Sequence, residues 1–304
     1  MALSILILGN GFDRNLDLRT SYNELIKSPE FQKLLDSGNQ LAQYINQIAP
    51  SKWHGLEKSL SQYAQDIHPD SNLFLKEYNS LKDTIKQYYL KISMECVVKP
   101  CMASDVLISN YIPRMQKPSD SLLIINFNYT NTASLILKAY LGWEGRIINF
   151  LENIMSLFDS SYQSRLSHLQ MIHPHGSVDN EIVFGVSDSD DVGDYIFLKK
   201  STSKTYVPGF SDSVLNCAEA IVFFGFSLGE PDHHYFENLF HELSLGKQGR
   251  KRIVFYYYGE KERLKLMSEL DVLTNNHLSK LRMNNDVMFY DNSQAYEPTY
   301  LFND

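Results

Sequence analysis

Four short motifs in the chain carry residue types that could bind a nucleotide and assist its hydrolysis. The segment Gly9–Asp13 combines glycines, which let a backbone approach a phosphate closely, with a carboxylate that can stabilise positive charge. The segment Asn126–Thr130 supplies two amides that can both donate and accept hydrogen bonds. Each has a structural alternative, because glycines also serve tight turns, and Asn128 or Thr130 could cap a following helix.

The other two motifs add imidazoles and a second glycine turn. His173 and His175 stand two residues apart, so in an extended segment both would face the same side. A neutral imidazole can accept a proton near physiological pH, and no third zinc ligand with recognisable spacing lies nearby, which favours a general base. A purely structural pair is the alternative. Phe224–Gly229 is a second strand end followed by a glycine-containing turn that could hold a phosphate or a ribose. Asp232 follows this turn and could contact a ligand or cap a helix.

These motifs follow apolar runs that have the character of buried strands. Helix-like segments separate most of the runs, which predicts an α/β fold with a mainly parallel, Rossmann-like sheet flanked by helices. Ligands of such sheets bind beyond the carboxyl ends of the strands, so the four motifs should converge there. The predicted strands are Leu3–Leu8, Leu122–Asn126, Arg146–Phe150, Ile182–Phe184, Ala220–Gly225, Ile253–Tyr258 and Val287–Tyr290.

A long helical region separates the first predicted strand from the second. It opens with a capping box, because Glu24 follows Ser21 by three residues. Further along, apolar residues recur at helix-face spacing between Phe74 and Ile92. We therefore predict one domain over residues 1–304 with a helical insertion at 20–118, which packs over the carboxyl edge of the first strand.

Composition excludes several classes of protein. The formal net charge of −8 argues against a general binder of nucleic-acid phosphates, so nucleic acid is not an expected partner. Cys96, Cys101 and Cys217 lack the paired spacing of a disulfide frame or a metal site, which fits reduced thiols in a cytoplasmic protein. No apolar run approaches the roughly 20 residues that span a bilayer, so no membrane association is expected.

The motifs taken in order resemble the AbiH family of bacterial phage abortive-infection proteins. More distantly, they resemble SIR2-type NAD-binding folds, in which a glycine turn, an asparagine, a His-Gly pair and a later Gly-x-Ser surround the dinucleotide. The resemblance rests on Gly9–Asp13 with Thr20–Tyr22, Trp53 and Glu57, Asn126–Thr130, His173–Gly176, and Gly225–Leu228 with Asp232, Tyr235 and Phe236.

The SIR2-like pattern implies roles for particular positions. Asn128 would stand at the ribose-side asparagine and His175 at the catalytic histidine, while Gly225 and Ser227 would lie near the adenosine half. Two positions depart from that pattern, because Asn10 replaces a small alanine and Thr130 replaces an aspartate. The three cysteines cannot form the four-thiolate zinc ribbon of deacylating sirtuins, which disfavours protein deacylation and leaves NAD cleavage.

The resemblance therefore predicts an effector that cleaves NAD, as substrate, without a metal. We expect three catalytic residues, with His175 as the base, Asn128 positioning ribose or water, and Asp13 supplying negative charge. The pyrophosphate would lie on the amides of the first glycine turn. The expected nucleotide-binding residues are Gly9, Asn10, Gly11, Phe12, Asn126, His173, Gly225, Ser227, Leu228 and Asp232.

Two other functions stay open at this point. One is a nucleotide-binding regulatory or sensor module that turns nothing over, and the other is a metal-dependent nuclease in which the imidazoles and Asp13 assist phosphodiester chemistry. Besides NAD or a related nucleotide, a phage-derived trigger or partner protein is expected, since an enzyme that depletes NAD must be restrained in healthy cells. Assembly into a homo-oligomer is a further way to impose that restraint.

Overall fold

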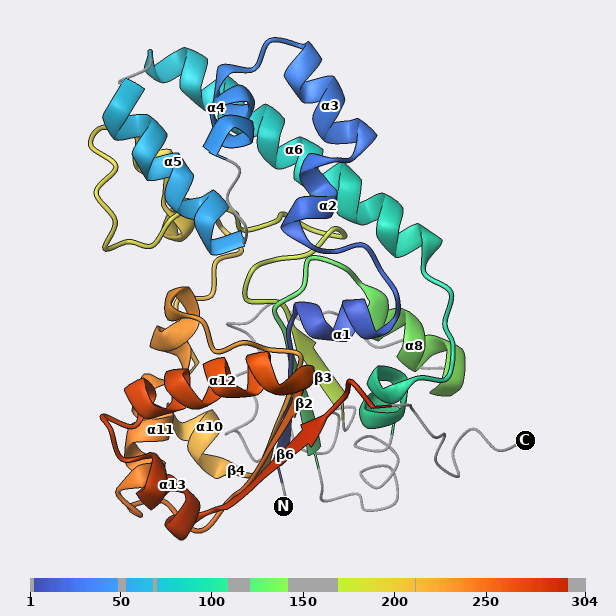
Figure 1. Cartoon of the computed structure of the whole chain (residues 1–304), viewed down its shortest axis with the longest axis vertical. Coiled ribbons are helices and arrows are strands. Elements are labelled where there is room, and N and C mark those ends of the chain that lie inside the picture. The colour runs from blue at the N-terminus through green and yellow to red at the C-terminus, as the bar shows by residue number, and fades with distance from the viewer. Residues whose placement is uncertain are drawn as a thin grey trace, which may run out of the picture.

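Six strands form one parallel sheet in the computed structural model, which describes residues 3–48, 53–67, 70–108, 121–141, 169–210 and 212–294 (Figure 1). The strand order is β3-β2-β1-β4-β5-β6, and every neighbouring pair is parallel. This order confirms the predicted Rossmann-like α/β fold. From β1 the chain adds β2 and β3 on one side and then β4, β5 and β6 on the other, so the switch point of the sheet lies between β1 and β4. The strands are β1 (Leu3–Leu8), β2 (Ser121–Asn126), β3 (Leu169–Ile172), β4 (Ala218–Phe224), β5 (Arg252–Tyr257) and β6 (Asp286–Asp291).

Helices cover both faces of the sheet, which explains why the central strands are apolar throughout. Ile5 and Ile7 of β1 point into one core, whereas Leu6 and Leu8 point into the other. The first core is closed by α10 (Asp212–Cys217), α11 (Glu237–Ser244), α12 (Gly259–Leu273) and α13 (Leu278–Asn284). The second is closed by α1 (Asn10–Asn15), α8 (Thr132–Leu141) and a helical segment at 102–108.

Five helices between β1 and β2 form a separate layer beyond the carboxyl edge of the sheet, in the upper half of Figure 1. They have their own core, and the predicted capping box is present, with the Ser21 amide donating to Glu24 Oε2 at 2.9 Å. The segment 102–108 already packs on the sheet, so this helical layer ends with α6. Its helices are α2 (Tyr22–Ile26), α3 (Pro29–Asp36), α4 (Gln40–Ile48), α5 (Trp53–Ile67) and α6 (Ser71–Glu95).

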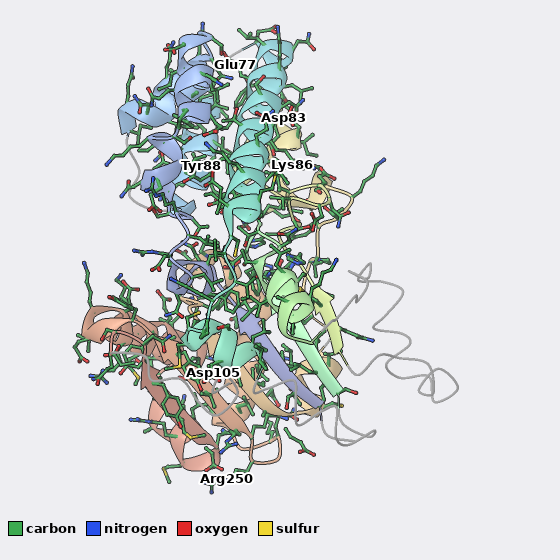
Figure 2. The ribbon with its side chains drawn as sticks, turned by 90° about the vertical axis from the view of Figure 1, so that its right-hand side faces the viewer. Glu77, Asp83, Lys86, Tyr88, Asp105 and Arg250 are labelled. Atoms are coloured by element: carbon green, nitrogen blue, oxygen red, sulfur yellow. The ribbon has the colours of Figure 1, made fainter. Side chains whose placement is uncertain are left out.

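Helix α6 attaches the helical layer to the loop that follows β3. Lys82 forms an ion pair with Glu181 at 2.7 Å, and Lys86 Nζ donates to the Asn180 carbonyl at 2.5 Å. The Tyr78 hydroxyl donates to the Phe184 carbonyl from the same helix face. Figure 2 shows Lys86 on this long helix. The loop that carries His173 and His175 is therefore bound to both layers.

One predicted strand does not form, one strand was missed, and one predicted strand cannot be compared with the described residues. Ile182–Phe184 was wrongly predicted as a strand, since it forms only an isolated bridge between Ile182 and Gly176. Its side chains are apolar because they belong to the core under the helical layer. Strand β3 escaped prediction because it is four residues long, too short for a clear period. Arg146–Phe150 lies outside the described residues.

Candidate functional site at the carboxyl edge of the sheet

The two glycine turns, after β1 and after β4, pack directly against each other. A Cβ atom on Gly9 would lie 2.6 Å from the Gly225 carbonyl oxygen, and one on Gly11 would lie 2.5 Å from Gly225 Cα. Gly225 has a φ of +60°, and a Cβ there would lie 2.4 Å from the Gly11 backbone. Only glycine permits this approach, so the paired turns fix β1 and β4 at the switch point of the sheet.

The amides of the first glycine turn are used inside the protein. The Gly9 amide donates to the Phe224 carbonyl at 3.0 Å, and the Gly11 amide donates to the Gly225 carbonyl at 2.9 Å. The expectation that a pyrophosphate lies on these two amides is therefore wrong for this conformation, because both donors are already satisfied. The glycines allow the turns after β1 and β4 to pack against each other. The spacing of glycines within one turn could not predict this contact with a distant turn.

Other residues of the motif Gly9–Asp13 also have partners within the protein. Asn10 Oδ1 accepts a hydrogen bond from the Thr20 hydroxyl at 2.5 Å. The Phe12 ring is fully buried and packs edge-on against Phe224 at 5.8 Å between centroids. The two side chains thus anchor α1 to the segment leading into α2 and to β4, and Phe12 belongs to the core.

Asp13 is buried to 1% exposure and lies between two threonines of the turn after β2. Thr130 Oγ1 donates to Asp13 Oδ2 at 2.7 Å, and Thr132 Oγ1 donates to Asp13 Oδ1 at 2.6 Å. Burial raises the pKa of Asp13 to about 6, although both hydrogen bonds favour the charged form. Asp13 therefore ties α1 to the entry of α8, and both of its carboxylate oxygens accept hydrogen bonds from the threonine hydroxyls.

Asn128 is held by residues from three neighbouring strand ends. Its Nδ2 donates to the Gly9 carbonyl at 3.1 Å, and its backbone amide donates to Asn126 Oδ1 at 3.0 Å. His173 Nδ1 lies 3.2 Å from the Asn128 carbonyl, which requires the proton on Nδ1. The strand ends of β1, β2 and β3 thus meet at this asparagine, which brings three of the four motifs together.

Two buried polar atoms beside Asn128 have no hydrogen-bond partner among the described residues, namely Asn126 Nδ2 and His173 Nε2. The first is a donor, and the second is an acceptor because burial lowers the pKa of His173 to about 4. Leaving such atoms unpaired costs about 1 to 3 kcal/mol each, so a bound polar group would stabilise them. This pair is the strongest sign of ligand binding at the strand ends.

His175 lies on a tight turn shortly after β3. The Gly176 amide donates to the His173 carbonyl at 3.0 Å, and Gly176 has a φ of +69°. A Cβ on Gly176 would lie 1.9 Å from the Glu181 carbonyl oxygen, so the turn requires glycine. The expectation of an extended segment with both imidazoles on one side is therefore wrong, and the two histidines have different surroundings.

The partner of His175 is Asp232, which comes from the 3-10 helix η3 (Glu230–Tyr235) after β4. His175 Nε2 lies 3.2 Å from Asp232 Oδ1, and both side chains are less than one-fifth exposed. Burial opposes ionisation of Asp232, but attraction to His175 and Lys200 outweighs it and lowers its pKa. The 3.2 Å separation is an ion-pair contact without hydrogen-bond geometry, because Asp232 Oδ1 has no hydrogen-bond partner among the described residues.

A buried ion pair completes this group, and sequence reasoning did not include it. Lys200, in the 3-10 helix η2 (Lys200–Thr202), lies 2.9 Å from Glu57 Oε1 and 3.0 Å from Oε2. Glu57 belongs to α5 of the helical layer and appears in the sequence only as part of a family-like block. Lys200 stands in a polar segment without a motif, so no sequence signal could have found it.

The remaining predicted residues lie on the loop between β4 and η3. Ser227 is exposed, whereas Leu228 is fully buried with a φ of +50°. His233 Nε2 lies 2.9 Å from the Leu228 carbonyl and 3.0 Å from Glu269 of α12, which fixes the loop from its outer side. Ser227 can reach a ligand from this position, while Leu228 shapes the loop that presents Asp232.

Residues 5–257 of the chain match a family model, bacteriophage abortive infection AbiH. The chain belongs to the AbiH family. This AbiH protein is therefore a bacteriophage abortive-infection protein, and the matched residues extend from the first glycine turn to the end of β5. The SIR2-type likeness is not part of that match and stays a prediction. No curated protein matches the chain in sequence.

Two kinds of feature are missing from the part of the chain that the structure describes. None of the helices in these ranges combines the length and apolar character that crossing a membrane demands. Within the same part of the chain, no three side chains among His, Cys, Asp and Glu are grouped so that they could hold a metal ion.

Proposed function

We propose that this AbiH protein acts in the cytoplasm as an anti-phage effector that hydrolyses NAD to nicotinamide and ADP-ribose. The observation that carries the proposal is the His175–Asp232 pair, whose imidazole packs edge-on against Phe127, the residue before Asn128, at 5.2 Å between ring centroids. An imidazole beside a carboxylate can act as a general base, and the unpaired atoms of Asn126 and His173 offer a ligand one donor and one acceptor. The three cysteines are free thiols, which fits a reducing compartment.

The reaction breaks the bond between nicotinamide and the anomeric carbon of the ribose. The bonding pair leaves with nicotinamide, and water adds to the oxocarbenium-like carbon while Nδ1 of His175 takes one water proton. The products are nicotinamide, ADP-ribose and a proton, which His175 releases to solvent. Asp232 stabilises the imidazolium that forms during the step, because its carboxylate faces the opposite ring nitrogen.

The other predicted residues have distinct parts in this mechanism. Asn128 positions the ribose or the attacking water, and its own geometry is fixed by Gly9, Asn126 and His173. Asp13 acts through the threonines that it holds and is a positioning residue for the turn after β2.

Residues on the β4 side of the switch point complete the proposed site. Ser227 faces solvent on the β4 side, where the adenosine half would lie. The packed turns at Gly9, Gly11 and Gly225 form the floor of the site.

The direct test is release of nicotinamide from NAD by the purified chain. His175→Ala and Asn128→Ala should each abolish release while leaving the thermal unfolding temperature near that of the unchanged protein. His241→Ala is the matched control, since His241 is a more exposed histidine on α11. Full activity in both site variants would refute the assignments, and NAD binding without product would identify a nucleotide-binding module instead.

Activity of this kind has to be restrained until infection. We propose that a phage-derived molecule or a partner protein triggers it, so the assay should be run with and without lysate of infected cells. Release that appears only with infected lysate would support a trigger.

A further inference from the structure

Three arginines line a hollow at the amino edge of the sheet, at the other end of the strands from the proposed site. Arg250 lies in the loop before β5, Arg252 is the first residue of β5, and Arg282 lies in the last turn of α13. Figure 2 shows Arg250 at the opposite end of the molecule from Glu77 of α6. The hollow has a volume of about 430 Å³, and its other lining residues are Asn285, Asp286, Val287 and Met288.

Two of the three guanidinium groups are held in place by neighbouring side chains. Arg250 Nη2 and Nε both donate to Asp286 Oδ1, at 2.6 and 3.1 Å. The guanidinium carbon of Arg282 lies 5.6 Å from the centroid of the Phe289 ring in β6. A guanidinium has five N–H donors, so both side chains keep donors for a ligand. Because these contacts already order the side chains, binding a ligand would cost them less conformational entropy.

The hollow is positively charged although the chain as a whole is acidic. Its lining has three arginines and a single carboxylate, Asp286, whereas the formal net charge of the chain is −8. Asp286 pairs with Arg250, and among the residues that the structure describes neither Arg252 nor Arg282 has an ion-pair partner. Two exposed guanidinium groups therefore face the hollow without a carboxylate to neutralise them.

We propose that this hollow is a second ligand site, which binds a small molecule that carries phosphate groups. Guanidinium groups match the oxygens of a phosphate as two-pronged donors, and a buried or paired carboxylate does not compete for Arg252 and Arg282. The volume is within the range of about 300 to 1,000 Å³ that small-molecule sites occupy. Val287 and Met288 offer apolar surface to the carbon part of such a ligand.

The net charge and the position of the hollow narrow the proposal further. A chain with a net charge of −8 repels a long polyanion, which disfavours nucleic acid and favours a compact anion. Strands β5 and β6 are six residues long, so roughly 17 Å of strand separates the two edges of the sheet. The arginine-lined hollow is thus separate from the proposed NAD site, and its ligand does not depend on the reaction proposed there.

The test is isothermal titration calorimetry of the full chain with inorganic pyrophosphate at low ionic strength. Arg252→Met and Arg282→Met should each weaken binding about tenfold, because each removes a charge-assisted contact with the anion. Arg263→Met is the matched control, since it removes the same charge from α12, where Arg263 pairs with Glu260 and does not line the hollow. The control should keep the affinity of the unchanged protein.

A lysine variant separates geometry from charge. Arg252→Lys keeps the charge but loses the two-pronged donor, so its affinity should lie between those of the unchanged protein and Arg252→Met. Arg252 and Arg282 are exposed, so the variants should unfold at the temperature of the unchanged protein. Equal affinity in Arg252→Met, Arg282→Met and Arg263→Met would overturn the proposal, as would no binding of millimolar pyrophosphate.

A parallel titration with ADP identifies the source of the phosphate. Tighter binding of ADP than of pyrophosphate, weakened by the same two substitutions, would support a nucleotide as the ligand. Tighter binding of pyrophosphate would support a free phosphate compound. Nicotinamide release is measured separately, so failure of the NAD reaction and failure of this site are distinguishable.

Discussion

Two carboxylates, Asp13 and Asp232, follow the neighbouring strands β1 and β4, the first fully buried and the second 19% exposed, and their surroundings act on them in opposite directions. Asp13 has two neutral hydroxyls as partners, and burial raises its pKa to about 6. Burial also opposes ionisation of Asp232, but His175 and Lys200 reverse the result and lower its pKa. The contrast separates a structural junction, centred on Asp13 and the paired glycine turns, from a charged junction centred on Asp232.

The contrast teaches that position at the carboxyl edge does not by itself make a residue functional. The structural junction is closed by backbone contacts and satisfied hydrogen bonds, so changes there should alter stability. The charged junction combines an imidazole, a carboxylate and a buried cation, so under the proposed function changes there should alter activity and its pH dependence. Three predictions test this division.

The largest effect is expected from Asp232→Asn at the charged junction. The amide keeps the shape of the side chain but loses the charge that pairs with His175, so nicotinamide release should fall about 10²- to 10⁴-fold. Steady-state rates measure this, with Glu230→Gln of the same 3-10 helix as the control because Glu230 is exposed. If Asp232→Asn releases nicotinamide at a rate within twofold of Glu230→Gln, the Asp232 carboxylate has no role in activity, and the contrast with Asp13 is contradicted.

At the structural junction, Gly225→Ala should lower the free energy of unfolding by about 3 to 4 kcal/mol, from left-handed strain plus overpacking. The added Cβ would lie 2.4 Å from Gly11 backbone atoms that cannot move aside. Gly38→Ala is the control, since Gly38 has a φ of +80° with no atom near its Cβ. Its cost should be about 1 kcal/mol from strain alone. Equal losses in urea unfolding would contradict the close packing of the turns.

The smallest of the three effects concerns pH and Asp13. Its folded pKa of about 6 exceeds the ordinary value of 3.8, so the unfolded chain loses this proton first as pH rises. Stability from this group is therefore complete below pH 3.8 and lost as pH rises through 6, by on the order of 3 kcal/mol. Asp13→Asn should remove this decline, measured as the difference in unfolding free energy between pH 4 and pH 7.

The control for this measurement is Asp36→Asn, at the exposed end of α3. Asp36→Asn should keep the pH dependence of the unchanged protein. If Asp13→Asn also keeps it, Asp13 is not the buried acid that distinguishes the structural junction from the charged one.

Local patterns were sufficient to predict the fold class and several of its parts. The apolar runs predicted β1, β2, β4 and β5, because strands buried on both faces are apolar in their central residues, and they also predicted the partly exposed edge strand β6. The Ser21 capping box and the buried face of α6 also follow from spacing along one helix. The four-residue β3 was too short to be predicted. Ile182–Phe184 was wrongly predicted as a strand, because a segment buried under helices has the same apolar residue types as a strand.

The sequence by itself determined the alternation of strands and helices around most of the sheet and placed Asn126 and Asn128 at the end of β2, since these features depend on residues close together in the chain. Only the tertiary structure decided which side chains of the site meet. Glu57 and Lys200 are 143 residues apart, and His175 pairs with an aspartate from a different loop. Such contacts are set by the packing of the helical layer on the sheet, and the electrostatic field at each carboxylate depends on neighbours that chain order does not reveal.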